Sequence, residues 1–106
     1  MRKIVKTKFG NEIIFANEDF FVGKFLEFMM NKETDYEVSS YNRLFYVDEG
    51  AVRFTINGTD YEFGFGKSIL IQKGTKFKIF SITPAKIIEI AQTSLPEDFS
   101  GGRSGK

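Results

Sequence analysis

The sequence predicts an all-β fold of the sandwich or barrel kind, and three observations support this prediction. The chain has 106 residues, of which 13 are phenylalanine, and phenylalanine, isoleucine and valine suit a pleated, half-buried surface. Turn signals recur at short intervals, as between the short strands of a sandwich or barrel. Between the turns, apolar and polar residues alternate as half-buried strands require. The length is that of one ordinary domain, which we place at residues 1–99, with N-terminal strands in 1–35 and a core in 36–93.

The first strands are expected at residues 11–15 and 20–30, followed by a strand at 43–47 that leads into Gly50. The segment 20–30 could also form a helix, because Phe21, Phe25, Phe28 and Met29 fall at helical spacing. Gly23 and the aromatic residues disfavour a helix, so we expect a strand there.

The clearest element is a hairpin over residues 51–63. Val52 and Phe54 alternate with residues of the opposite face, and a second alternating run follows the pair Asn57-Gly58. A type I′ turn needs positive φ at both central residues, which makes Asn-Gly between two alternating runs the strongest short-range signal for a hairpin.

The last strands are expected at residues 68–72, 76–82 and 86–92. The first of these is almost continuously apolar, and the second alternates between lysine and apolar residues. Residues 100–106 contain no apolar side chain and are expected to form a disordered tail.

Charge and composition exclude several classes of function. Fifteen Lys and Arg against 14 Asp and Glu give a net charge of +1, which excludes binding to nucleic acid or an anionic membrane by bulk charge. The chain has no His and no Cys, so the usual ligands of zinc, copper and non-haem iron and the commonest general base are missing. No segment approaches the about 20 apolar residues of a membrane-spanning helix, and no apolar run of a secretory signal follows the basic start. We expect a cytoplasmic protein with neither nucleic-acid nor membrane partners.

The glycines Gly50, Gly66 and Gly74 lie at the spacing of a known family. With the Asn57-Gly58 hairpin between the first two of them, the stretch 37–90 resembles a cupin. Gly50 stands at the end of the family's first motif, and the run from Gly66 to Gly74 matches the glycine spacing of the second. The resemblance implies a small double-stranded β-helix, or jelly-roll, barrel.

The positions that bind a metal in the family carry other residues here. Counting back from Gly50 places Arg43 at the glutamate position, and counting on from Gly74 places Phe77 at the third histidine position. The first two histidine positions fall on Glu37 and Ser39, or, with the longer spacer, on Tyr36 and Val38. Arg43 would bring a fixed positive charge to a cation site, and Phe77 has no lone pair to offer. We therefore expect a cupin-like barrel without a metal or another cofactor.

Six residues form the candidate ligand-binding site, whereas no catalytic residue can be assigned. They are Glu37, Ser39, Tyr41, Arg43, Phe77 and Glu89. The Arg43 guanidinium could hold a carboxylate or phosphate; alternatively it pairs with Glu37 or Glu89, or reaches solvent. Glu37 and Ser39 could contact a ligand beside Arg43 or cap a loop.

The other candidates also have two interpretations. Tyr41 could orient a ligand or belong to the core or a dimer surface, and Phe77 could fill the former metal space or form the floor of an apolar pocket. Glu89 is a general-acid candidate if it shares the inward face of Ile87, because burial would raise its pKa; otherwise it is solvated. Lys24 could likewise face inward or be solvated, and we expect it to be solvated.

Three functions are compatible with this pattern. We favour a metal-free cupin-like domain that binds or senses a small polar or anionic ligand, sugar-like or a carboxylate, rather than an enzyme. A structural module with a filled barrel is the first alternative; cupins commonly pair through N-terminal strands, and segment 20–30 offers apolar surface, so we expect a homodimer. A metal-independent sugar-nucleotide isomerase or epimerase is the second, in which Tyr, Glu or Lys would replace the usual His base.

Overall fold

The computed structural model describes residues 3–94, and these residues form β-strands and no helix. The strands are β1 (Lys3–Lys6), β2 (Gly10–Asn17), β3 (Phe21–Phe28), β4 (Glu37–Val38), β5 (Asn42–Glu49), β6 (Ala51–Ile56), β7 (Thr59–Gly64), β8 (Ser68–Ile71), β9 (Lys76–Ser81) and β10 (Ala85–Gln92). The expected tail at 100–106 lies outside the described residues, as does the end of the domain at 99. Within residues 3–94, no helix is long and apolar enough to span a membrane.

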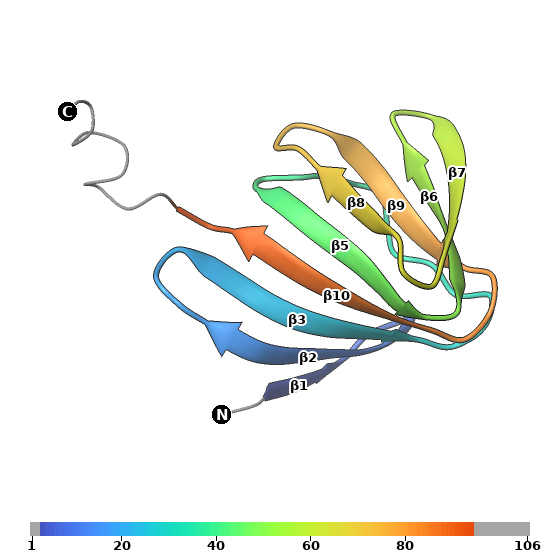
Figure 1. Ribbon diagram of the computed structural model, residues 1–106, viewed down its shortest axis with the longest axis horizontal. Helices are drawn as coiled ribbons and strands as arrows, with labels where there is room; N and C mark the ends of the chain where they lie inside the picture. The colour runs from blue at the N-terminus through green and yellow to red at the C-terminus, as the bar shows by residue number, and fades with distance from the viewer. Residues whose placement is uncertain (1–2, 95–106) are drawn as a thin grey trace.

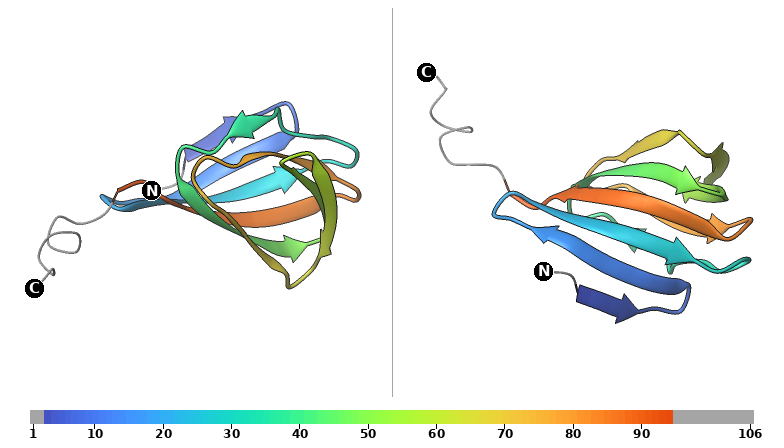
Figure 2. Two further views of the ribbon diagram at one scale, coloured as in Figure 1. Left: turned by 90° about the horizontal axis from the view of Figure 1, so that it is seen from above. Right: turned by 60° about the horizontal axis from the view of Figure 1, so that its bottom comes forward.

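The strands form two antiparallel sheets that face each other across the core (Figures 1 and 2). One sheet has six strands in the order β1-β2-β3-β10-β5-β8, and the other has four in the order β4-β9-β6-β7. Neighbours such as β3 and β10 are far apart in the sequence, so the pairing interleaves the two ends of the chain. The all-β prediction is confirmed, and the interleaved pairing gives the walls of a jelly-roll barrel.

The hairpin predicted around Asn57-Gly58 is present as β6 and β7. Asn57 and Gly58 have φ values of 48° and 86°, the positive pair of a type I′ turn. The register places Ile56 opposite Thr59, directly across this two-residue turn.

The segment 20–30 forms the strand β3, not a helix. It pairs with β2 on one side and with β10 on the other. Leu26 and Phe28 are buried in the core, while Phe21 and Phe25 lie on the opposite face. The expected strand is confirmed, and the aromatic residues fall at helical spacing because both faces of this strand carry large apolar residues.

Aromatic residues fill part of the space between the sheets. Phe45, Phe54 and Phe77 are fully or almost fully buried. The ring of Phe45 lies 5.3 Å from that of Phe54 and 5.7 Å from that of Phe77, measured between centroids. These are edge or tilted contacts of the kind that aromatic pairs prefer.

Gly50 holds a sharp turn between β5 and β6 against the loop that precedes β10. Its φ is 83°, which L-residues with a side chain adopt at a cost. A Cβ atom at this position would lie 2.2 Å from the carbonyl oxygen of Pro84. Both the positive φ and the close approach to Pro84 therefore require glycine at this position.

Candidate functional site

A cavity of about 200 Å³ lies inside the barrel beside the phenylalanine core. It is lined by Phe9, Glu12, Lys24, Leu26, Thr34, Glu37, Arg43, Phe45, Phe77, Ile79 and Glu89. An open depression near Asp35 adjoins it on one side and shares Glu12 and Glu37 with it. A second pocket of about 200 Å³ adjoins it on the other side and shares Arg43 and Glu89 with it. The barrel is thus only partly filled, and the hollow part carries charged side chains.

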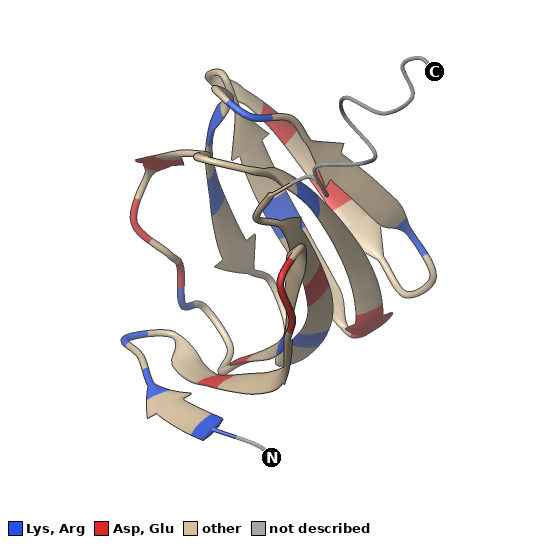
Figure 3. Cartoon of the chain, turned by 90° about the vertical axis from the view of Figure 1, so that its left-hand side faces the viewer, with Lys and Arg blue, Asp and Glu red and all other residues tan. Residues whose placement is uncertain are grey.

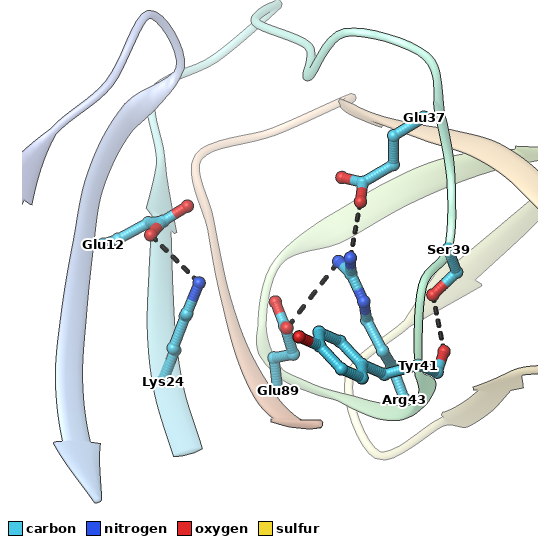
Figure 4. Close-up of polar contacts among 7 residues, drawn as sticks. All are labelled: Glu12, Lys24, Glu37, Ser39, Tyr41, Arg43 and Glu89. Carbon is cyan, nitrogen blue, oxygen red and sulfur yellow. Dashed lines mark hydrogen bonds and ion pairs between the residues drawn. The ribbon is translucent and has the colours of Figure 1, made fainter. Parts of the chain in front are cut away.

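Arg43 is the centre of this charged group (Figure 4). It lies on the inner face of β5, in alternation with the buried residues Phe45 and Val47. Its Nη2 donates a hydrogen bond of 2.5 Å to Oε2 of Glu37, and its Nη1 lies 3.7 Å from Oε2 of Glu89. Its Nε is buried and has no acceptor among the described residues. The ion-pair alternative for Arg43 therefore holds with both carboxylates at once.

Glu89 points into the barrel from β10, on the same face as Ile87 and Ala91. Its side chain is 6% exposed. Burial raises the pKa of Glu89; the charges of Arg43 and Lys24 oppose this rise, and Glu12 and Glu37 add to it. No described residue gives Glu89 a hydrogen bond, because the Arg43 contact is too long for one. Its carboxyl group can therefore hold a proton or accept a hydrogen bond from outside the chain.

Lys24 and Glu12 form a second ion pair on the same wall, with Nζ 3.3 Å from Oε1. Lys24 stands directly opposite Glu89 in the β3–β10 register. The expectation that Lys24 is solvated was wrong, since it is partly buried and lines the cavity. Its alternation with Leu26 could have revealed this, whereas no sequence signal linked Glu12 to the site.

Tyr41 and Ser39 lie apart from the inner cavity. Tyr41 lines the second pocket, together with Arg43 and Glu89. Ser39 is buried, and its hydroxyl donates a 2.6 Å hydrogen bond to the carbonyl oxygen of Tyr41. That bond shapes the chain before β5. The structure brings Glu37, Arg43, Phe77 and Glu89 together, places Tyr41 next to them, and does not bring Ser39 to the cavity.

The charges of the cavity nearly balance. Three carboxylates, of Glu12, Glu37 and Glu89, face two cations, Lys24 and Arg43, so the formal charge is −1 when all are ionised. Elsewhere along the strands and loops, basic and acidic residues are interspersed (Figure 3). The cavity can both donate and accept hydrogen bonds, which is the requirement for holding hydroxyl or carboxylate groups.

Comparisons with known proteins identify the architecture. No family model and no curated protein matches this sequence. An RmlC-like cupin from Shewanella frigidimarina superposes with a TM-score of 0.81 at 15% identity, over 93% of this chain and 89% of that one. KdgF from Halomonas sp. gives 0.78 at 13% identity, over 90% and 89%. The cupin domain of Cnp3 from Schizosaccharomyces pombe gives 0.70 at 17% identity, over 95% and 69%.

The chain has a cupin fold. At these identities the likeness concerns the fold, and the prediction of a small cupin-like barrel is confirmed.

The side chains of this cupin-fold chain are not suited to bind a divalent metal ion at the positions that bind one in the family motif. Arg43, Glu37 and Phe77, expected at metal-binding positions, do converge, with the Arg43 Cζ 5.5 Å from the centroid of the Phe77 ring. However, the guanidinium already lies between two carboxylates, and the ring offers no donor atom. Residues 3–94 contain no group of three Asp, Glu, His or Cys side chains arranged to hold a metal ion.

Proposed function

We infer that this cupin-fold chain is a binding module for a small polar ligand, sugar-like or a carboxylate, held in the barrel cavity without a metal ion. The observation that carries this proposal is the buried, charged group around Arg43, which lies on the wall of a hollow part of the barrel. A purely structural barrel gains nothing from the buried carboxylate of Glu89 in its interior, because desolvating such a group is costly.

The cavity offers a ligand both hydrogen-bond acceptors and hydrogen-bond donors. Glu89 faces the cavity as an acceptor without a donor. Lys24 and Arg43 supply donors from β3 and β5. The rings of Phe45 and Phe77 form an apolar wall below these groups. A few convergent polar groups over an aromatic floor are typical of a site for a small molecule.

An NMR titration tests this proposal. Glucose, glucuronate and lactate are added in turn to ¹⁵N-labelled protein, and the backbone amides of Lys24, Arg43 and Glu89 are followed. At least one probe is expected to shift these amides in a saturable manner.

The variant Arg43→Gln should abolish that response. Arg53→Gln is the matched control, since Arg53 lies on the outer face of β6 with its guanidinium over Phe80. No shift with any probe, or equal shifts in Arg43→Gln and wild type, would contradict the binding function.

The outer face of the six-stranded sheet favours a second role, association with another copy of the chain. One row of paired residues across the strands consists of Ile4, Ile13, Phe25, Ile88 and Tyr46. A second row consists of Ile90, Leu44 and Leu70. Leu44 and Leu70 are exposed, and they alternate with buried residues of the core.

The size of this face suits a homodimer. Four of the six strands have eight residues, and β1 and β8 have four each. At about 3.3 Å per residue and about 4.8 Å per strand they cover about 600 Å² in projection, and a standard interface buries about 800 Å² per partner. A second copy presents the same apolar rows, so a twofold arrangement covers both faces at once.

A further inference from the structure

Glu37 and Glu89 share the Arg43 guanidinium but differ strongly in accessibility. The side chain of Glu37 is 45% exposed, whereas that of Glu89 is 6% exposed. Glu37 nevertheless makes the shorter contact, a hydrogen bond from Nη2 of Arg43. The better-bonded carboxylate is therefore also the one that solvent and solutes reach.

The backbone around Glu37 is fixed, but its side chain has one anchor. The amides of Thr34 and Ser39 donate to the carbonyls of Ile79 and Thr75 on either side of it. The carboxylate itself has Arg43 as its one hydrogen-bond partner among the described residues. Glu37 can therefore leave Arg43 by rotating its side chain, while β4 stays in place.

The charge of the cavity favours this rotation of Glu37 when a second carboxylate enters. With its three carboxylates and two cations ionised, the cavity carries a formal charge of −1 before any ligand enters. A ligand carboxylate added beside Glu37 would make the charge of the cavity −2. A ligand carboxylate that replaces Glu37 leaves the charge of the cavity unchanged. The planar guanidinium of Arg43 holds an incoming carboxylate with the same donors that it uses for Glu37.

We propose that Glu37 is a built-in competitor for the ligand: a small carboxylate such as a 2-hydroxy acid binds Arg43 by displacing Glu37, while Glu89 remains in place. This proposal rests on the binding function above and narrows its ligand to the carboxylate class. It also makes Glu37 a residue that sets affinity without providing a contact in the complex.

Calorimetric titration of lactate and glucose into wild type, Glu37→Gln and Glu33→Gln tests the proposal. Glu33 is the matched control because its side chain is 46% exposed and pairs with Lys78 at 3.2 Å, away from the cavity lining. Lactate should bind Glu37→Gln about fivefold more tightly than wild type, the upper value of an exposed ion pair. Glu33→Gln should match wild type, and any affinity for glucose should be the same in all three proteins.

The outcomes separate this proposal from the binding function. Equal lactate affinity in wild type and Glu37→Gln, or an equal gain for glucose, overturns the competitor role and leaves the binding function standing. Absence of binding of both probes to all three proteins overturns both. Glu37→Ala, checked for native folding by its NMR spectrum, must repeat the gain for lactate.

Discussion

The guanidinium of Arg43 lies over the ring of Phe77, with its Cζ 5.5 Å from the ring centroid. Sequence resemblance placed these two residues at metal-binding positions of a cupin, and the fold brings them together. A cationic side chain thus lies next to an aromatic ring in the interior of the barrel. Glu37 and Glu89 then lie around the guanidinium, and the aromatic face below it adds a favourable cation–π contact.

The stability of the barrel should depend on Arg43. Arg43→Gln leaves Glu89 buried without its nearest cation, so we expect the free energy of unfolding at neutral pH to fall by about 3 kcal/mol. Urea unfolding followed by circular dichroism measures this change. Arg53→Gln, on the outer face, should lose less than about 1 kcal/mol. Equal losses in the two variants would show that the Arg43 cluster is not a buried ion-pair network.

Glu89 should make stability depend on pH. Burial raises the pKa of Glu89 above its ordinary value of 4.5, so the folded protein holds this proton more tightly than the unfolded chain. The stabilising contribution of Glu89 is therefore fully present below pH 4.5 and is lost as the pH rises through the raised pKa. Glu89→Gln keeps the shape but does not titrate. Its free energy of unfolding should improve relative to wild type as the pH rises above 4.5 and through the raised pKa, and a difference that does not change with pH would contradict the raised pKa.

Local patterns predicted the frame of the fold. Asn57-Gly58 predicted the hairpin because the chemistry of the turn is contained in these two residues. The sequences of strands β1 and β4 contain no comparable signal for a strand, because both strands are short and exposed.

The site was harder to predict than the frame. The sequence left Glu89 either on the inward face of Ile87 or solvated, and the structure places it inward. The Lys24–Glu12 pair depends on the β2–β3 register, which is a tertiary property. Ser39 satisfies the spacing of the family motif, yet its hydroxyl bonds to a backbone carbonyl that no motif records.

The close approach at Gly50 yields a matched test. Gly50→Ala and Gly74→Ala both place a side chain at positive φ, 83° and 91°. At Gly50 the new Cβ meets the Pro84 carbonyl at 2.2 Å, whereas nothing lies within 4 Å of it at Gly74. We expect a loss of about 1 kcal/mol at Gly74 from backbone strain alone, and at least about 3 kcal/mol at Gly50. Thermal unfolding compares the two, and a similar loss in both would exclude the close contact.

Association should depend on the outer face of the six-stranded sheet. Leu70→Lys places a charge in the apolar row, so sedimentation analysis should find a dimer for wild type and a monomer for this variant. Val38→Lys is the control, because Val38 is 60% exposed, similar to Leu70 at 61%, but lies on β4 of the other sheet. A monomeric wild-type protein, or a dimer that tolerates Leu70→Lys, would contradict this interface.

The most direct measurement is the ¹H–¹⁵Nε resonance of the Arg43 guanidinium, followed by NMR as lactate is added. We predict that this resonance moves and saturates together with the backbone amide of Glu89, because the ligand enters the cavity that both residues line. An unchanged Arg43 resonance, with shifts confined to the outer faces of the sheets, would contradict a binding site inside the barrel.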